Sequence, residues 1–485
     1  MITTSKYREN TVGVLGLGKT GISLIKSLMA GGAHVIAVDD KVNVMGQVMS
    51  IPEFQQSLQS KQLAVRNISP NELATLDALF VSPGVPAQQK LSHPLIVQAR
   101  ELNIPILSDL DLLYDCCPSA FYIGVTGTNG KSTTTALITH SLKYCIKYHD
   151  NTSYIEDVQM GGNIGTPALN LKPFTSPHQA YVLEVSSFQL DLLSDIQFDI
   201  AILLNTSPDH LDRYGEVKHY IESKAKIFQH NNKNIPKISE KQFYEIISVD
   251  YEETATIYKK LQNNPNIATS VIPISTQSTL LHGISIIQGI LYINDCFGIQ
   301  KQQCILPPAP HLQGVHNAEN ILANIATCLG AGFDIDIVLE SLPSYRGLPH
   351  RMQLVFQDAN FSFINDSKAT NIAAVSYALS TYENIHWIVG GFSKDEGIQA
   401  LSHLFYRVRC AYLIGKTTGE FAKVLDQHGV QHYKCYTLDA ALETIKQKVI
   451  SGNVLLSPAC ASLDQWKNYE ERGDFFEKRV KDLFS

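Results

Sequence analysis

The stretch I-G-V-T-G-T-N-G-K-S-T-T-T-A-L, residues 123–137, decides the fold of the segment around it. An apolar strand end, Tyr122 to Val125, meets a glycine turn, and a helix-forming run follows from Thr133 to Leu142. Glycines in such a turn let backbone N–H groups approach an anion, and the dipole of the following helix favours negative charge. The pattern therefore predicts a phosphate-binding loop between a buried strand and a helix.

The side chains of this loop add chemistry that a plain strand–helix turn does not need. Lys131 is expected to reach the outer phosphates of a nucleoside triphosphate, and a hydroxyl of Ser132 or Thr133 is expected to bind Mg²⁺. The spacing departs from the usual loop, because Val125 occupies the position five before Gly130. A purely structural turn is the alternative interpretation.

Length and composition limit the number of domains and the classes of protein to be considered. The chain has 485 residues, which suits two to four domains, and its net charge of −7 implies no surface for binding nucleic acid. The nine cysteines form no C-x-x-C pair and are expected to be reduced thiols of a cytoplasmic protein. The N-terminus has no apolar signal region, and no apolar run is long enough to span a membrane.

A second glycine-rich turn, G-L-G-K-T-G at 16–21, lies near the N-terminus. It follows an apolar run at 11–15, precedes a helical pattern, and is followed by a strand at 34–38 that ends in Asp39 and Asp40. This is the context of a dinucleotide-binding turn. The motif alone does not identify the nucleotide, and a tight turn for helix–strand packing is the alternative.

Polar residues follow several other predicted strands. Glu184 ends the apolar run at 180–183 and is interpreted as a Mg²⁺ ligand, with a helix N-terminal charge as the alternative. The run at 200–204 leads to a polar loop in which His210 lies at the expected active edge. On spacing alone, Lys224 and Lys226 read as the solvated face of an amphipathic helix.

Other segments carry weaker signals. Residues 144–160 are interpreted as an irregular surface loop, and 229–300 are less informative apart from strand-like runs at 283–288 and 290–293. A helical pattern follows 311–320, where Asn317 and Asn320 either reach a nucleotide or cap the helix. Beyond a Pro-bearing hinge at 347–351, further strands end in the polar loops 365–371 and 457–473.

Eight motifs together resemble the Mur ligase family. In chain order they are T-G-T-N-G-K-S-T, G-G-N-I-G, L-E-V-S-S-F-Q-L, D-H-L-D-R-Y, H-N-A-E-N, G-L-P-H-R, N-D-S-K-A-T-N and L-S-P-A-C-A-S-L-D-Q-W. The last four narrow the resemblance to the branch that adds D-glutamate. The phosphate loop also occurs in folylpolyglutamate synthetases, so a sister Mur ligase or a folate-type ligase is the near alternative, and a dehydrogenase-like module is a more distant one.

The resemblance implies an α/β fold of three domains. Residues 1–117 would form a Rossmann-like domain for the UDP substrate, 118–346 a central ATPase domain with a mostly parallel sheet, and 347–485 a C-terminal Rossmann-like domain. The implied reaction joins D-glutamate to UDP-N-acetylmuramoyl-L-alanine through an acyl phosphate, consumes ATP, and uses two Mg²⁺. A monomer without nucleic-acid or membrane partners is expected.

The resemblance also assigns roles to individual residues. Those implied in catalysis are Lys131, Glu184, His210 and Lys224. Those implied in ATP binding are Gly127, Thr128, Asn129, Gly130, Lys131, Ser132, Thr133, Asn317, Asn320, Arg351 and Asp366. Those implied for the UDP substrate are Gly18, Lys19, Thr20, Asp39, Ser82, Asn163, Ser186 and Gln189, and those for D-glutamate are Lys368, Thr370, Lys394, Ser462, Leu463 and Tyr469. The implied metal ligands are Ser132, Glu184, His210 and Lys224, the last as a carbamate.

The resemblance changes the interpretation of one lysine, and the chain departs from the family pattern at one position. The carbamate reverses the interpretation of Lys224 as a solvated lysine, and nothing in composition or spacing would indicate it. After the second strand the family often has Asp-Thr-Arg, whereas this chain has Asp39-Asp40-Lys41, so that Asp40 adds a negative charge near the expected uridine site.

Overall fold

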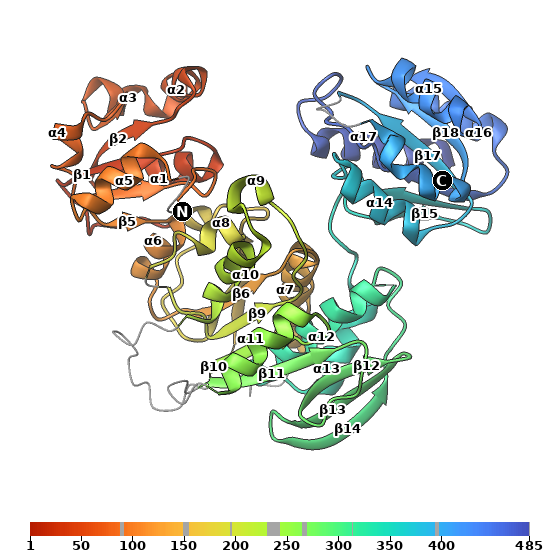
Figure 1. The fold of residues 1–485 in the computed structure, drawn as a ribbon, viewed down its shortest axis with the longest axis horizontal. Helices are drawn as coiled ribbons and strands as arrows, with labels where there is room; N and C mark the ends of the chain where they lie inside the picture. The colour runs from red at the N-terminus through yellow and green to blue at the C-terminus, as the bar shows by residue number, and fades with distance from the viewer. Residues whose placement is uncertain are drawn as a thin grey trace. The chain divides into compact units, whose positions relative to one another are not determined.

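The computed structural model describes residues 1–87, 92–148, 155–194, 196–229, 243–263, 269–312, 314–392 and 397–484. It contains three sheets with helices packed on them, and most neighbouring strands are parallel (Figure 1). This confirms the predicted α/β class. Two compact units are present, Met1–Pro308 with Val315–Pro343, and Ala309–Gly314 with Ser344–Ser485. The boundary expected between residues 117 and 118 stays a prediction.

The first sheet is parallel, with the order β3-β2-β1-β4-β5 of a Rossmann half-fold. Its strands are β1 (Thr11–Leu15), β2 (His34–Val38), β3 (Leu63–Val65), β4 (Ala78–Val81) and β5 (Ile106–Leu107). Its helices are α1 (Lys19–Ala30), α2 (Val42–Met49), η1 (Pro52–Phe54), α3 (Gln55–Gln59), α4 (Pro70–Leu73), α5 (Pro94–Glu101) and α6 (Asp109–Cys116). The predicted strands and the glycine turn between β1 and α1 are confirmed.

The central sheet has the order β14-β13-β12-β11-β10-β9-β6-β8-β7 and is parallel except for β13 and the antiparallel pairings it makes. Its strands are β6 (Phe121–Thr126), β7 (Asp157–Gly162), β8 (Gln179–Glu184), β9 (Ile200–Leu203), β10 (Phe243–Ser248), β11 (Thr269–Ser275), β12 (Gly283–Ile287), β13 (Ile290–Cys296) and β14 (Ile299–Ile305). Its helices are α7 (Lys131–Tyr148), η2 (Ala168–Asn170), α8 (Ser187–Leu190), α9 (Leu211–Tyr214), α10 (Val217–Ala225), η3 (Lys226–Phe228), α11 (Glu252–Gln262), α12 (Val315–Gly330), α13 (Ile335–Ser341) and η4 (Leu342–Ser344).

One sequence-based interpretation is wrong here, and one stretch that gave little signal has regular structure. The expected loop at 144–160 begins as the last turn of α7 and ends in β7, where Val158 is buried; residues 149–154 lie outside the described residues. The uninformative stretch after residue 229 contains β10 and β11, which extend the parallel sheet, and α11 between them. In both places short elements are held by the neighbouring strand or helix, which local periodicity does not reveal.

The third sheet belongs to the C-terminal unit and has the order β15-β16-β20-β17-β18-β19, with only β15 antiparallel to its neighbour. Its strands are β15 (Gln353–Gln357), β16 (Phe361–Asn365), β17 (Ile385–Gly390), β18 (Val408–Ile414), β19 (His432–Tyr436) and β20 (Gly452–Leu456). Its helices are α14 (Ile372–Thr381), η5 (Ile398–Arg407), α15 (Thr418–Gln427), α16 (Leu438–Lys448) and α17 (Tyr469–Phe484). β15 and β16 form an antiparallel hairpin at one edge of this sheet.

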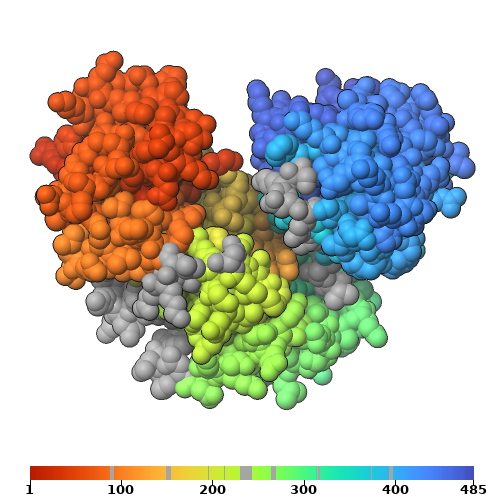
Figure 2. Space-filling model, turned by 45° about the horizontal axis from the view of Figure 1, so that its top comes forward, coloured from red at the N-terminus to blue at the C-terminus, as the bar shows by residue number. Residues whose placement is uncertain are grey.

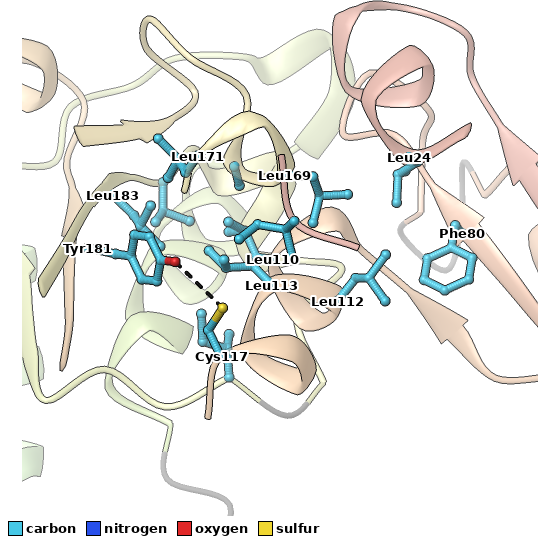
Figure 3. Close-up of a cluster of buried hydrophobic side chains, with 14 of the residues drawn as sticks. Leu24, Phe80, Leu110, Leu112, Leu113, Cys117, Leu169, Leu171, Tyr181 and Leu183 are labelled. Atoms are coloured by element: carbon cyan, nitrogen blue, oxygen red, sulfur yellow. Dashed lines mark hydrogen bonds between the residues drawn. The ribbon is translucent and has the colours of Figure 1, made fainter. Parts of the chain in front are cut away.

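A large apolar cluster joins the first sheet to the central sheet. Leucines of α6 lie between Phe80 of β4 and Tyr181 of β8, and the Tyr181 hydroxyl donates to Sγ of Cys117 at 3.5 Å (Figure 3). In the space-filling view, side chains coloured red to orange lie against brown and yellow ones of the central segment (Figure 2). This shared burial fixes the two sheets of the first unit to each other.

A buried carboxyl group lies at the start of α6, close to this cluster. Asp109 is 2% exposed, accepts hydrogen bonds from backbone N–H groups, and its Oδ1 has no partner among the described residues. Burial raises the pKa of Asp109 to about 7, and the charge of Asp111 adds to the rise. Because the folded-state pKa exceeds the ordinary value of 3.8, the stability that this group contributes is complete below pH 4 and is lost as the pH rises to 7.

We therefore predict that Asp109→Asn raises the free energy of unfolding at pH 8 by about 1–3 kcal/mol and raises it less at pH 5. Thermal unfolding at both pH values measures the difference. Asp336→Asn is the matched control, since Asp336 is an exposed aspartate in the first turn of α13. An equal effect of Asp109→Asn at both pH values would contradict the prediction.

Candidate active site

The carboxyl ends of four neighbouring parallel strands carry the polar residues of the candidate site. In the order β9, β6, β8 and β7, these ends lead to Asn205, to the loop at 127–130, to Glu184 and to Asn163. Parallel strands end at one edge of their sheet, and open α/β sheets bind ligands there. The topology thus brings together residues that the sequence predicted separately.

Glu184 has one satisfied and one unsatisfied carboxylate oxygen. The side chain is buried; its Oε1 accepts a hydrogen bond of 2.8 Å from Nδ2 of Asn163, and its Oε2 has no partner among the described residues. A buried anionic oxygen without a donor is costly. Since carboxylate oxygens are preferred ligands of Mg²⁺, this position fits a divalent cation.

Two lysines approach the same carbonyl oxygen of the phosphate loop. Nζ of Lys131 donates to the Gly127 oxygen at 2.9 Å, and Nζ of Lys224 donates to it at 2.7 Å. Lys224 is 1% exposed, so its first interpretation as a solvated lysine is wrong. Burial and the positive charge of Lys131 lower the pKa of Lys224 well below its ordinary value.

Lys226 also differs from its predicted role as a solvated lysine. Its Nζ lies 2.8 Å from Oδ1 of Asp191, whose side chain is 3% exposed. One residue after α10, Lys226 therefore ties η3 to the turn that follows α8. Its contact is separate from the phosphate loop, so the two lysines of this short segment have different surroundings.

An asparagine that the sequence did not single out holds the phosphate loop. Oδ1 of Asn205 accepts from the Asn129 N–H at 2.8 Å, and its Nδ2 donates to Oε2 of Glu319 at 2.6 Å. The carbonyl of Asn205 also accepts from the Thr128 N–H at 2.9 Å. Glu319 is buried, and burial raises its pKa. Asn205 therefore fixes the loop through contacts on two of its residues.

The start of α12 lies against the same loop. Oδ1 of Asn320 accepts from the Thr134 hydroxyl at 2.9 Å, and its Nδ2 donates to Oδ1 of Asn317 at 3.0 Å. A Cβ at Gly130 would lie 2.5 Å from Oδ1 of Asn320, and Gly130 has a φ of +80°. Glycine is therefore required there, both for the backbone and for the approach of α12.

His210 lies among aromatic rings at the start of α9. It has a φ of +51°, and its ring centroid lies 4.8 Å from that of Phe188 and 6.1 Å from that of Tyr220. Nζ of Lys224 lies 4.6 Å from the Tyr220 ring centroid, so His210 and Lys224 share one neighbour. The Tyr220 hydroxyl is 3.2 Å from Oγ1 of Thr128, which connects this group to the phosphate loop.

Several residues predicted to contact the UDP substrate have local partners. Ser186 and Gln189 form a capping box at α8, so their sequence pattern has a structural cause as well. Asp39 accepts from the Leu17 N–H at 2.8 Å and thereby holds the first glycine turn. Ser82 donates to the Gly16 oxygen at 2.6 Å, from the loop after β4.

The C-terminal unit holds most of the remaining predicted residues in two strand-end loops, 365–371 and 457–464. Asp366 is buried and accepts from the Ser457 hydroxyl at 2.8 Å; burial raises its pKa to about 7. Arg472 of α17, which the sequence did not single out, donates to both oxygens of Ser367 and to the Cys460 oxygen. It therefore joins the two loops.

The other predicted residues of this unit differ in exposure. Ser462 is buried, Leu463 is 63% exposed, and Nζ of Lys368 lies 5.8 Å from the Tyr469 ring centroid. Thr370 and Arg351 are partly buried. Lys394 lies outside the described residues.

Sequence position alone could have indicated Asn205 and Glu319, but not their contacts. Asn205 directly follows a buried strand, and Glu319 lies between two asparagines that were singled out. Their hydrogen bond spans more than a hundred residues, so no local pattern predicts it. Arg472 gives a still weaker signal, because it reads as one more charge on a polar helix.

The chain is similar to known proteins over nearly its whole length. Residues 10–108 match the model of the Mur ligase MurD-like N-terminal domain, and residues 125–328 match that of the Mur ligase middle domain. A relative from Rickettsia prowazekii is 36% identical over 98% of both chains, and one from Paramagnetospirillum magneticum is 37% identical over 99% of this chain and 98% of its own. Both carry the name UDP-N-acetylmuramoylalanine--D-glutamate ligase.

The chain belongs to the Mur ligase family.

Solved structures agree with this Mur ligase on the fold. UDP-N-acetylmuramate-alanine ligase MurC from Thermotoga maritima has a TM-score of 0.53 at 18% identity and covers 98% of this chain and 100% of its own. The MurF ligase of Thermotoga maritima in complex with ADP has the same TM-score and identity, with 99% and 97% coverage. Among the described residues of this chain, no helix is long and apolar enough to cross a membrane.

Replacing Asn205 tests its hold on the phosphate loop. We predict that Asn205→Ala lowers the affinity for ATP by about tenfold or more, because it frees the Asn129 N–H and leaves Glu319 without its donor. Calorimetric titration with ATP measures the affinity. The double variant Asn205→Ala, Glu319→Ala should unfold at a higher temperature than the sum of the single effects implies, since it leaves no buried carboxylate unpaired.

The matched control for this prediction is Asn453→Ala. Nδ2 of Asn453 donates to the Glu383 oxygen at 2.7 Å, at an exposed position of the C-terminal unit. Its replacement should leave ATP affinity unchanged. Strict additivity of the two single variants at Asn205 and Glu319 would contradict the coupling.

Proposed function

We propose that this chain is an ATP-dependent ligase that adds D-glutamate to UDP-N-acetylmuramoyl-L-alanine, a step of peptidoglycan precursor synthesis. The observation that carries the chemistry is the convergence of the phosphate loop, Glu184 and the buried Lys224 at one sheet edge. The names of the full-length relatives support the choice of substrates. We further propose a cytoplasmic monomer, with domain boundaries after residues 117 and 346.

In this reaction the alanyl carboxylate of the UDP substrate takes the γ-phosphoryl group of ATP and becomes an acyl phosphate. The amine of D-glutamate then attacks the acyl carbon, and a tetrahedral intermediate collapses to the amide and phosphate. Backbone N–H groups of the loop at 127–130 and the N-terminus of α7 would hold the ATP phosphates. Lys131 would turn from the Gly127 oxygen toward the outer phosphates and offset the charge of the transferred group.

The metal proposal rests on the donor set at the sheet edge. Glu184, with its unpartnered Oε2, and the hydroxyl of Ser132 would hold Mg²⁺, and His210 would be a further ligand. Two Mg²⁺ ions would supply charge neutralisation around the phosphates and the reacting carboxylate. Among the described residues, no three His, Cys, Asp or Glu side chains gather closely enough to hold a metal ion.

This shortage of acidic ligands supports a carbamate on Lys224. The lowered pKa favours the uncharged form of the amine, and that form can attack carbon dioxide: its lone pair forms the N–C bond and the nitrogen releases a proton. The product is an anion in place of a buried amine. It would add carboxylate oxygens beside Glu184 and place a negative charge next to the positive charge of Lys131.

The remaining assignments follow the family resemblance. For ATP we propose the residues of the loop and four later ones: Gly127, Thr128, Asn129, Gly130, Lys131, Ser132, Thr133, Asn317, Asn320, Arg351 and Asp366. For the UDP substrate we propose Gly18, Lys19, Thr20, Asp39, Ser82, Asn163, Ser186 and Gln189. For D-glutamate we propose Lys368, Thr370, Lys394, Ser462, Leu463 and Tyr469.

Amino-acid specificity tests the proposed function. We predict that phosphate release from ATP requires both UDP-N-acetylmuramoyl-L-alanine and D-glutamate, because the acyl phosphate accumulates without an amine to consume it. A phosphate assay across D-glutamate, L-alanine, L-lysine and meso-diaminopimelate measures this. Preference for one of the other three amino acids would assign the chain to a different Mur reaction, and NAD(P) binding without ATP turnover would support a dehydrogenase-like module.

Substitution of Lys224 tests the carbamate. We predict that Lys224→Arg lowers kcat by about a hundredfold or more, because a guanidinium cannot form a carbamate or bind a cation. Nuclear magnetic resonance with ¹³C-labelled bicarbonate should show a carbamate signal in the native protein and none in the variant. Lys226→Arg is the control, since its partner is Asp191 and lies apart from the loop. An active, Mg²⁺-dependent Lys224→Arg enzyme would contradict the proposal.

A further inference from the structure

Arg213 connects the loop that carries His210 to a loop of the first sheet. From α9, its Nη1 donates to the Pro83 oxygen at 3.0 Å and its Nη2 donates to the Val85 oxygen at 2.9 Å. Nη1 also lies 3.4 Å from the Gly84 oxygen. One guanidinium thus spans consecutive carbonyls of the segment 82–86, which follows β4.

The same guanidinium lies over an aromatic ring of the candidate site. Its central carbon is 3.8 Å from the ring centroid of Phe188, which belongs to α8. Phe188 in turn contacts His210, with 4.8 Å between the ring centroids. The position of Arg213 is therefore linked to that of His210 both along the chain and through Phe188.

The segment 82–86 is itself held to the first glycine turn. The Ser82 N–H donates to the Leu15 oxygen at 2.9 Å, and the Ser82 hydroxyl donates to the Gly16 oxygen at 2.6 Å. A Cβ at Gly16 would lie 2.8 Å from a methyl of Val85, so the turn and the segment are closely packed. Arg213 thus holds a loop that is fixed to the turn proposed for the UDP substrate.

We infer that Arg213 is a positioning residue that sets the distance between the UDP-substrate loops and the His210 loop. It acts through the carbonyls at 83–85 and through Phe188. This rests on the proposed function, which gives the two loops their roles. A planar guanidinium donates in two directions while it stacks on a ring, and an ammonium cannot do both. The geometry of the guanidinium, rather than its charge, is the property that the inference requires.

The consequence is a coupling between the UDP substrate and the metal. With Arg213 in place, the loops of the first sheet that would bind the UDP substrate are aligned with His210 and Glu184, which would hold Mg²⁺. Without Arg213 each loop keeps its own ligand, but the two are misaligned. Misplacement by about 1 Å can cost about a hundredfold in rate. The loss therefore appears in kcat and in the Mg²⁺ requirement, and the affinities for separate ligands remain.

The test compares the variants Arg213→Gln and Arg213→Lys with the native protein. Both variants are expected to lower kcat about 10- to 100-fold and to raise the Mg²⁺ concentration needed for half-maximal rate. The dissociation constants of UDP-N-acetylmuramoyl-L-alanine and of ATP, each measured alone, should change little. Hydrogen exchange should increase at 82–87 and at 210–215 and stay unchanged in β6 and β8. Arg213→Lys keeps the charge, so failure of Lys to restore kcat isolates the geometry of the guanidinium.

Arg407→Gln is the matched control. The Arg407 guanidinium carbon lies 5.3 Å from the Tyr406 ring centroid, and its Nη1 donates to the Tyr382 oxygen at 3.2 Å. Arg407 therefore makes the same two kinds of contact as Arg213, but in the C-terminal unit. It should leave kcat and the Mg²⁺ requirement unchanged.

Any of three results in the kinetic and binding assays would overturn the inference: native kcat in Arg213→Gln, full rescue by Arg213→Lys, or a loss of UDP-substrate affinity as large as the loss of kcat. Increased exchange throughout the first unit would also overturn it, because the residue would then be a general stabiliser. The native protein is assayed first with D-glutamate. If it shows no ligation, the proposed function fails, whereas the exchange comparison still decides whether Arg213 links the two loops.

Discussion

Two lysine nitrogens donate to one carbonyl oxygen, that of Gly127, and this contact constrains the whole site. Two like charges within hydrogen-bond distance of one atom repel each other, and burial removes the water that would screen them. The less exposed of the two, Lys224, therefore has its pKa lowered, with burial the larger cause. The fold therefore favours the uncharged amine of Lys224 more than water does, and the uncharged amine is the nucleophilic form.

The site depends equally on supports that lie outside it. The phosphate loop follows β6 without the early glycine of the usual motif because Val125 is buried within the strand, and the turn begins only at Gly127. Its course is then set by Asn205 from one side and Asn320 from another. Because Asn205 is held by the buried Glu319, the loop is connected to α12 through a carboxylate whose own pKa is raised. The loop is thus positioned by two separate segments of the chain, the end of β9 and the start of α12.

Much of the fold and of the candidate site could be predicted from the sequence. The physical reasons for these successes also explain which predictions were wrong. Buried parallel strands such as 11–15 and 200–203 read as continuous apolar runs, and glycine turns mark their carboxyl ends, so the α/β fold and the site edge were predictable. Lys224 was misread because helical spacing places a residue on a face without saying what covers that face. Residues 157–160 were misread because an edge strand depends on its neighbour, β8, more than on its own residues.

Long-range polar contacts are the features of the site that no local sequence pattern predicts. The bonds of Asn205 to Glu319, of Arg472 to Ser367 and of Arg213 to the carbonyls at 83–85 each join segments far apart in the chain. Each also joins a strand-end loop to a different structural element, and none lies at the centre of the proposed chemistry. Parallel sheets bring reactive groups to one edge, but they leave the loops at that edge to be aligned by other means. In this chain, buried amide, carboxylate and guanidinium groups supply that alignment, and the directional geometry of their hydrogen bonds is what apolar packing in the shared core cannot provide.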